Sequence, residues 1–402
     1  MRPNLPSAAC HDGIMRWSRS LAAGLTAGAL VLAACGSDDD PGAAPTTDPA
    51  RPAPTSPPSD PASTPPASPT PAPTATTLTG PVTAGDVTEI TTNLDAPWSI
   101  AFATDGTALV SQRDDETIVA VAADGTKTEV GTVPGVEGDT EGGLLGLAFD
   151  PAAPDRLYVY ATTGSTNSVL RTTYRDGSFG EFETLIDDIP ASGRHNGGRM
   201  TFGPDGMLYV GTGDAADGDN AQNPSSLAGS ILRVTPDGAA APDNPDPDSP
   251  VYSYGHRNVQ GLAFDDDGRL WASEFGSDEQ DELNLIEPGR NYGWPVVEGI
   301  ADDERFVDPL AEWRPAEASP SGLAYVADTL FLASLRGERL WRIPLEGASI
   351  GEPEVVLDGY GRLRDAVVAP DGSLWVLTNN TDGRNEPREA DDRILRLELV
   401  RP

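Results

Sequence analysis

The segment FGPDGMLYV at residues 202–210 decides the fold class of this chain. An aromatic residue is followed by a Pro-Asp-Gly turn and then by apolar, β-prone residues, which is the pattern of a tight β-hairpin. Related segments begin at residues 102, 149, 264, 324 and 368, so the hairpin recurs about every 45–60 residues. Further alternating segments follow the hairpins, for example ILRV at residues 231–234.

Repeated hairpins at this spacing, without a long amphipathic helix between them, predict an all-β fold, a six-bladed β-propeller. We expect a strand near residues 87–91 to close the ring against the last blade. A β-sandwich is the alternative fold, but it would not produce six copies at this period.

The composition divides the 402 residues into three parts. Residues 21–34 are apolar, follow Arg16 and Arg19, and are too few to span a bilayer comfortably. They end at LAACG around Cys35, which resembles a bacterial lipoprotein signal. Residues 41–79 lack aromatic residues and are rich in Pro, Ala, Thr and Ser, which is typical of a disordered tether.

We therefore expect a lipoprotein signal peptide at residues 1–35, a disordered tether at 36–85 and the propeller at 86–402. Lipidation of Cys35 would anchor the protein to the outer, extracytoplasmic face of the bacterial membrane, with no other membrane contact. An ordinary cleaved signal peptide is the alternative.

The charge balance excludes one class of partner. The chain has 63 acidic residues against 27 Lys and Arg, a net charge of −36, and a nucleic-acid-binding protein needs a basic face. An acidic chain suits Ca²⁺, which prefers oxygen ligands. Because the predicted propeller contains no cysteine, the sequence excludes a disulfide framework, thiolate-bound zinc and a cysteine nucleophile there.

A histidine and an aspartate flank the third hairpin. His195 lies in the glycine-rich loop before the hairpin, and Asp214 follows its second strand. Two antiparallel strands bring these positions together. A carboxylate that orients an imidazole is the arrangement of a general base. Isolated His–Asp pairs are more often structural, but the surrounding glycines favour a functional site.

Two further groups of residues predict ligands. Polar, glycine-rich segments before several hairpins should meet at one end of the ring, where arginines would form a site for an anion: Arg194, Arg257, Arg336, Arg362 and Arg364. The loop after the fourth hairpin carries five acids between Glu274 and Glu282, beside glycine turns, which indicates calcium.

Six motifs taken together resemble one known family. They are LLG at 144–146, HNGGR at 195–199, GD at 213–214, GHRNVQGL at 255–262, NYGWP at 291–295 and RLRD at 362–365. Their order resembles that of the soluble glucose/sorbosone (aldose sugar) dehydrogenases that depend on pyrroloquinoline quinone (PQQ). The resemblance implies a six-bladed propeller that binds PQQ and Ca²⁺ and oxidises a hydroxyl group of a small-molecule sugar. It leaves the sugar and the electron acceptor open.

The same resemblance implies roles for individual residues. His195 would take the hydroxyl proton, Asp214 would orient it, and Arg257 would polarise the quinone. The other implied cofactor-binding residues are Glu141, Asn258, Gln260, Asp281, Arg336, Arg362 and Arg364. Asp281 would line the cofactor site. The implied calcium ligands are the carbonyls of Gly276 and Ser277 at an activating ion, and Glu282 with the Tyr292 carbonyl at a structural ion.

The chain departs from the family pattern at three places, and these leave a second function open. Glu141 replaces a usual glutamine, Phe275 begins a segment that usually reads Gln-Gly-Pro or His-Gly-Pro, and Arg336 replaces a lysine. The alternative is a cell-surface propeller that binds a partner and has lost quinone-dependent activity. A hydrolase would need a Gly-x-Ser-x-Gly elbow or paired catalytic carboxylates, which the sequence lacks.

Overall fold

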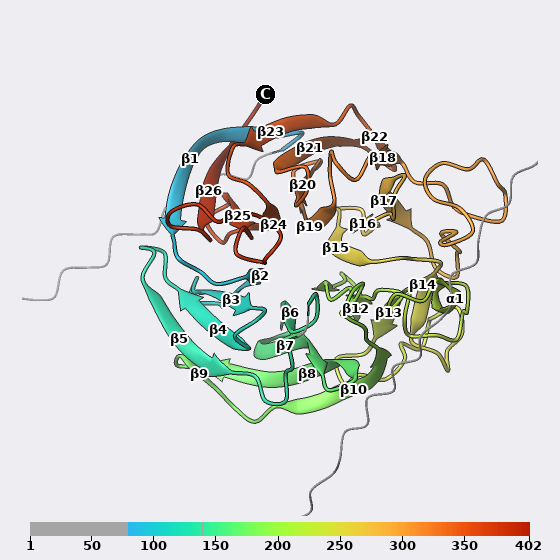
Figure 1. Cartoon of the computed structure of the whole chain (residues 1–402), viewed down its shortest axis with the longest axis horizontal. Helices are drawn as coiled ribbons and strands as arrows, with labels where there is room; N and C mark the ends of the chain where they lie inside the picture. The colour runs from blue at the N-terminus through green and yellow to red at the C-terminus, as the bar shows by residue number, and fades with distance from the viewer. Residues whose placement is uncertain (1–78, 139) are drawn as a thin grey trace, which may run out of the picture. The chain divides into compact units, whose positions relative to one another are not determined.

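The computed structural model describes residues 79–138 and 140–402. In this part of the chain, six antiparallel sheets are arranged in a ring (Figure 1). The fold is therefore a six-bladed β-propeller, as the hairpin repeat predicts. The inner strands of neighbouring blades contact one another around the centre of the ring.

The first three blades follow the chain in order. The first contains β2 (Pro97–Phe102), β3 (Ala108–Gln112), β4 (Thr117–Val121) and β5 (Lys127–Thr132). The second contains β6 (Leu144–Asp150), β7 (Ala153–Thr163), β8 (Thr166–Arg175), β9 (Ser178–Phe179) and β10 (Glu183–Pro190). The third contains β11 (Met200–Phe202), β12 (Leu208–Gly211), β13 (Ser230–Val234) and β14 (Val251–Tyr254).

The last three blades complete the ring. The fourth contains β15 (Val259–Phe264), β16 (Leu270–Glu274), β17 (Asp281–Ile286) and β18 (Ala311–Trp313). The fifth contains β19 (Pro320–Val326), β20 (Thr329–Ser334), β21 (Arg339–Glu346), β22 (Ser349–Ile350) and β23 (Glu354–Asp358). The sixth contains β24 (Leu363–Val368), β25 (Leu374–Thr378), β26 (Ile394–Val400) and β1 (Thr83–Thr91).

The ring is closed by the two ends of the described chain. Strand β1 pairs antiparallel with β26, and Thr83 lies opposite Val400. This confirms the predicted closing strand. However, β1 begins at Thr83 and not at Val87, so its first residues fall inside the segment predicted as tether.

In three of the six hairpin copies, the aromatic residue that opens the hairpin packs against an aromatic ring of the preceding blade. Phe202 meets Tyr158 edge to face, with ring centroids 5.2 Å apart. Phe264 meets Tyr209 at 5.0 Å, and Phe102 meets Trp375 of the last blade at 5.0 Å. Such pairs add about 0.5–1.5 kcal/mol to the burial of their area. The repeat in the sequence is thus a repeat of contacts between blades.

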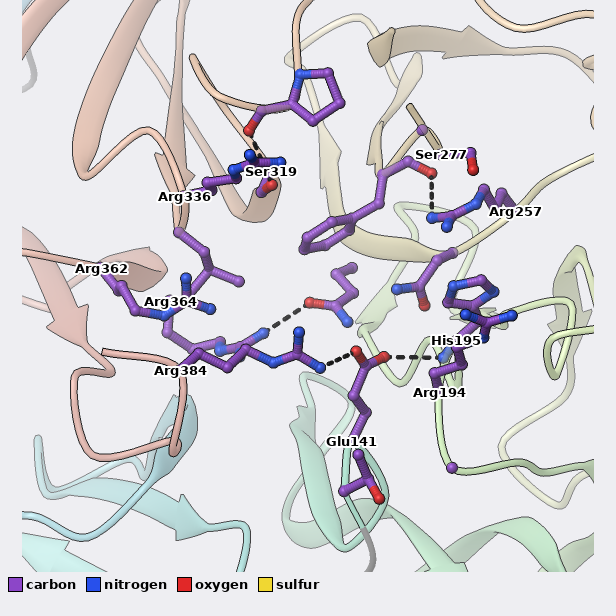
Figure 2. A pocket seen from close by; sticks show the side chains of 18 of the residues that line it. Glu141, Arg194, His195, Arg257, Ser277, Ser319, Arg336, Arg362, Arg364 and Arg384 are labelled. Atoms are coloured by element: carbon purple, nitrogen blue, oxygen red, sulfur yellow. Dashed lines mark hydrogen bonds and ion pairs between the residues drawn. The ribbon is translucent and has the colours of Figure 1, made fainter. Parts of the chain in front are cut away.

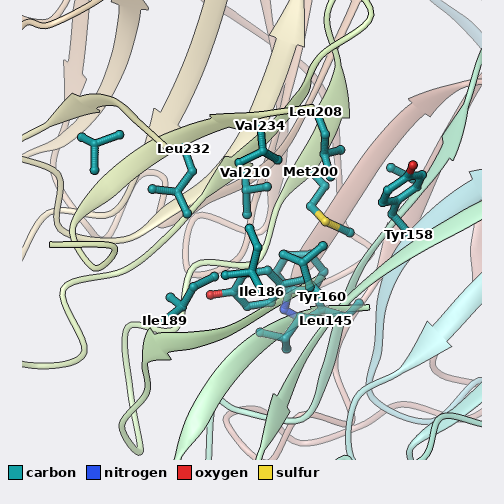
Figure 3. Close-up of a cluster of buried hydrophobic side chains, with 14 residues drawn as sticks. Leu145, Tyr158, Tyr160, Ile186, Ile189, Met200, Leu208, Val210, Leu232 and Val234 are labelled. Carbon is teal, nitrogen blue, oxygen red and sulfur yellow. The ribbon is translucent and has the colours of Figure 1, made fainter. Parts of the chain in front are cut away.

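Apolar side chains from neighbouring blades form the core. One cluster joins Leu145, Tyr158 and Tyr160 of the second blade to Met200 and Val210 of the third (Figure 3). Full burial of a large apolar side chain contributes about 1.5–3 kcal/mol. The core therefore holds the blades to each other as well as filling each sheet.

The Asp-Gly turns are explained by local hydrogen bonding. In the third hairpin, Gly206 has φ +76°, which favours glycine, and the Asp205 carboxylate accepts the Met207 N–H at 3.0 Å. Asp105 and Asp371 make the equivalent bonds in the first and last blades, both at 2.9 Å.

The predicted signal peptide, Cys35 and most of the tether lie outside the described residues. Within residues 79–138 and 140–402, no helix is long and apolar enough to cross a membrane. The single short helix found there is α1 (Gly218–Ala221).

Candidate active site

A pocket of about 650 Å³ opens at one end of the ring (Figure 2). Five loops that precede an inner strand contribute Glu141, His195, Arg257, Ser319 and Arg362 to its wall. Equivalent positions in the repeat therefore meet at one place. The residues that the sequence predicts and that line this pocket are Glu141, Arg194, His195, Arg257, Asn258, Gln260, Gly276, Ser277, Arg336, Arg362 and Arg364.

The imidazole of His195 is held by Asp214. The His195 Nδ1 lies 2.7 Å from Asp214 Oδ1, and the carboxylate is almost fully buried. Asp214 also accepts the Ala216 N–H at 2.7 Å and the indole N–H of Trp294 at 2.8 Å. Because these donors fix the carboxylate, it orients the ring so that Nδ1 donates to it and Nε2 is available as a base.

The backbone of His195 is fixed as tightly as its ring. Its φ is +59°, which is unusual for a residue other than glycine. The His195 N–H donates to Glu141 Oε2 at 2.9 Å, and its carbonyl accepts the Ala215 N–H at 3.2 Å. A Cβ at Gly213 would lie 1.9 Å from the His195 carbonyl oxygen, so the close approach of the two loops requires glycine there.

Seven arginines line the pocket of a chain whose net charge is −36: Arg113, Arg194, Arg257, Arg336, Arg362, Arg364 and Arg384. Some have carboxylate partners. Asp382 lies 2.9 Å from the Arg362 guanidinium and 3.7 Å from that of Arg364. Asp114 pairs with Arg113, and Glu141 pairs with Arg384.

Two of these guanidiniums are incompletely paired. In the part of the chain that the structure describes, the buried Nε atoms of Arg257 and Arg364 have no hydrogen-bond partner. Burial lowers the pKa of Arg364 to about 9, although Asp382 opposes this shift, and burial also lowers the pKa of Arg257. A bound anion would compensate both groups, so the pocket fits a ligand that carries carboxylates.

Polar contacts place the other predicted residues in the wall. Gln260 Oε1 accepts a hydrogen bond from Arg364 at 2.8 Å. Asn258 Oδ1 accepts the Gly197 N–H at 2.9 Å, which ties it to the loop of His195. The Arg257 guanidinium donates to the Phe275 carbonyl at 3.3 Å and lies 5.2 Å from the centre of the Trp294 ring.

Asp281 lies behind the pocket wall, contrary to the expectation that it lines the cavity. Its side chain is buried and accepts the N–H groups of Gly276 and Ser319, at 3.0 and 2.6 Å. Burial raises the pKa of Asp281 to about 6, against the effect of these two donors. Asp281 therefore positions two residues of the wall.

The predicted calcium ligands fall into two groups. Glu298 accepts the N–H groups of Ser277, Glu279 and Gln280, at 2.7–3.0 Å. Among the described residues, the Gly276 and Ser277 carbonyls accept no hydrogen bond from the chain. Free carbonyls beside carboxylates are a donor set that suits Ca²⁺.

The second group is Glu282 with the Tyr292 carbonyl, and a further buried acid, Glu274, lies beside Glu282. Glu282 lies opposite Glu274 in the sheet, and burial together with the Glu274 carboxylate raises the pKa of Glu282 to about 8. The Tyr292 ring stacks on His256 nearby, at 4.7 Å. A cation would relieve this repulsion. Still, no three His, Cys, Asp or Glu side chains are grouped as a metal site in the described part of the chain.

Several residues of the pocket were not predicted from the sequence, among them Trp98, Arg113 and Arg384. Trp98 lines the floor, with the guanidiniums of Arg364 and Arg199 at 5.8 and 4.5 Å from its ring centre. Arg113 directly follows an inner hairpin, a position that the repeat could have indicated. Arg384 lies in the loop between β25 and β26, outside the hairpin pattern that repeats along the chain.

The fold and the site together define a β-propeller in which an aspartate-bound histidine lies at an arginine-lined pocket. The chain belongs to the glucose/sorbosone dehydrogenase family, whose model matches residues 94–396. The PQQ-bound aldose sugar dehydrogenase of Streptomyces coelicolor is 50% identical, with a TM-score of 0.76 over 82% of this chain and 100% of that chain.

Two curated relatives of the chain are also sugar dehydrogenases. The aldose sugar dehydrogenase YliI of Escherichia coli is 28% identical over 72% of this chain and 89% of its own length. The quinoprotein glucose dehydrogenase B of Acinetobacter calcoaceticus is 31% identical over 55% of this chain and 54% of its own length. The chain is thus similar to sugar dehydrogenases across most of the propeller.

Proposed function

We propose that this protein is a PQQ-dependent aldose sugar dehydrogenase in which His195 is the catalytic base. The observation that carries the proposal is the His195–Asp214 pair, 2.7 Å apart, at the edge of a pocket lined by seven arginines. The names of the relatives support the cofactor and the substrate class. When bound, PQQ supplies a carbonyl group that accepts a hydride, and so the two electrons removed from the sugar.

Different residues of the pocket would bind the carboxylates and the reactive carbonyl of the quinone. Arg336, Arg362 and Arg364 lie on the side of the pocket opposite His195 and would hold the carboxylates of the quinone (Figure 2). Arg257 and Asn258 lie nearer His195 and would polarise the reactive carbonyl of the quinone. Burial of Arg364 strengthens its attraction for an anion, because the charge is poorly solvated.

His195 removes the proton of the hydroxyl group that is oxidised. Asp214 keeps Nδ1 protonated, so Nε2 accepts the proton while the adjacent carbon loses the hydride. Asp214 also stabilises the imidazolium that results. The hydroxyl carbon thereby becomes a carbonyl carbon.

Calcium is part of the proposal. The Gly276 and Ser277 carbonyls would bind an activating ion at the pocket, and Glu282 with the Tyr292 carbonyl would bind a structural ion. Free carbonyl oxygens and a buried, mutually repelling acid pair support these two positions. We also propose that lipidation at Cys35 holds the propeller at the outer face of the membrane; replacing Cys35 with alanine should release the protein from the membrane fraction.

The test is reconstitution. Purified protein supplied with PQQ and Ca²⁺ should reduce a dye when an aldose is added, and His195→Ala should abolish turnover while quinone binding by calorimetry remains. Arg364→Ala should weaken quinone binding itself. If no sugar of a broad panel is oxidised and calorimetry detects no quinone binding, the alternative of a partner-binding propeller replaces this proposal.

The departure at Glu141 does not favour that alternative. Its carboxylate is paired with Arg384, so it does not present an uncompensated negative charge to an anionic cofactor.

A further inference from the structure

Glu141 and Arg384 form an ion pair beside the candidate base (Figure 2). Glu141 precedes β6 in the second blade, whereas Arg384 comes from the loop between β25 and β26 in the sixth. One oxygen of Glu141 accepts the guanidinium of Arg384, and the other accepts the His195 N–H at 2.9 Å. Both carboxylate oxygens are therefore committed within the protein.

The hydrogen bond to Glu141 acts on a backbone that needs support. His195 has φ +59°, a conformation that residues with a side chain rarely adopt without tertiary restraint. Asp214 restrains the ring, and the Ala215 N–H restrains the carbonyl. Glu141 restrains the remaining polar group of the residue, its N–H. Without an acceptor there, the loop would lose one of these three restraints and the imidazole would be held less precisely.

Arg384 determines the charge that Glu141 presents to the imidazole. The acids that face His195 are Asp214 and Glu141, and the bases are Arg194 before it in the loop, Arg257 on the same side of the pocket, and Arg384 (Figure 2). An unpaired carboxylate at Glu141 would favour the protonated imidazole, which cannot accept a proton. The guanidinium of Arg384 cancels that effect.

We propose that Glu141 and Arg384 are a pair of positioning residues for His195. Glu141 holds the backbone of His195, and Arg384 prevents the charge of Glu141 from shifting the protonation of the His195 imidazole. The catalytic consequence rests on the proposed function, but the effect on His195 itself does not. The negative charge of Glu141 beside His195 is thus compensated by an arginine that lies 243 positions away in the sequence.

The first arm of the test separates hydrogen bonding from charge. Glu141→Ala removes the acceptor and should lower kcat about tenfold or more, because a misplaced base loses rate steeply, with a change of less than about twofold in KM for the sugar. Glu141→Gln keeps an acceptor oxygen and should retain at least about fivefold more activity than Glu141→Ala. Equal losses in the two variants would overturn the role of the hydrogen bond.

The second arm follows the protonation of His195 without turnover. The full chain has only three histidines, so NMR can follow the His195 ring, identified by its loss in His195→Asn, in protein without quinone. Arg384→Gln should move the midpoint of its titration upward by about half a pH unit or more, and the acid limb of the pH–rate profile should move equally. The double variant Glu141→Gln/Arg384→Gln should return the midpoint of the His195 titration to its wild-type value.

A matched control is available in the same blade. Arg396 is partly exposed and paired with Asp371 at 3.0 Å, but it does not line the pocket. Arg396→Gln should leave the titration of His195 unchanged. If Arg384→Gln also leaves it unchanged, the proposal fails. If no sugar is oxidised by any variant, the proposed function fails while the NMR arm still decides this inference.

Discussion

Replacing Gly213 with alanine should misplace His195 without altering any residue that carries charge. The new Cβ would lie 1.9 Å from the His195 carbonyl oxygen and 2.3 Å from its carbonyl carbon. Real Cβ contacts do not fall below 3.0 Å, so the loop must retreat by about 1.1 Å. Gly213 does not have a positive φ, so the backbone itself accepts alanine and the effect is steric.

A displacement of about 1 Å in a catalytic group can cost about 100-fold in rate. We therefore expect kcat/KM for Gly213→Ala to fall about 100-fold, with the loss mainly in kcat. Overpacking should also lower the free energy of unfolding by about 1–3 kcal/mol, so the assay must be run well below the melting temperature of the variant. Dye reduction with the reconstituted enzyme measures the rate, and circular dichroism monitors folding.

Gly193 provides the control for this experiment. It lies in the same loop and lines the pocket, but a Cβ there would meet only the Thr140 hydroxyl oxygen, at an ordinary 3.7 Å. Gly193→Ala should keep nearly full activity. The reasoning is refuted if folded Gly213→Ala stays within about threefold of the wild type, or if both alanine variants lose activity equally.

Two predictions concern stability. Asp365→Ala should lower the free energy of unfolding in urea by about 3–5 kcal/mol, because it leaves the buried Arg199 guanidinium, now 2.9 Å from the carboxylate, without a negatively charged partner. Loss of an exposed ion pair through Asp155→Ala should cost less than about 1 kcal/mol, and equal costs in the two variants would contradict this reasoning. In metal-free buffer, the raised pKa of Glu282, about 8 against an ordinary 4.5, keeps its carboxyl protonated in the folded state. The free energy of unfolding should therefore fall as the pH rises from about 4.5 to 8. Glu282→Gln should remove this dependence on pH. If the variant shows the same dependence as the wild type, Glu282 is excluded as its source.

The sequence is most informative about the fold where the same contact is repeated. Phe102, Phe202 and Phe264 each contact an aromatic ring of the preceding blade, so at these three copies the repeat marks where two blades meet. The start of β1 was harder to place, since TAGDVTEIT is polar, contains Gly85 and lies at the outer edge of its sheet with only its last residue buried. Its pairing partner is more than 300 residues away, and local sequence does not indicate such a partner.

In the site too, residues at repeated positions could be predicted, whereas residues held by a partner far away in the sequence could not. Glu141, His195 and Arg362 precede inner strands of different blades, so the repeat itself predicts that they converge. Arg384 could not be predicted in this way, because its place is determined by an ion pair with a residue 243 positions away. Asp281 shows a different difficulty. An acid in a cofactor loop can face the cavity or hold the loop from behind, and the two cases look alike in sequence.

The pairing of β1 with β26 also determines when the propeller can be completed. Thr83 and Val400 are neighbours in one sheet, so the sixth blade lacks a strand until the last residues of the chain have been synthesised. A nascent chain would carry five assembled blades at most, with unpaired edges at both ends of an open arc. Truncations at opposite ends of the sequence should therefore produce the same defect, an arc that cannot shut.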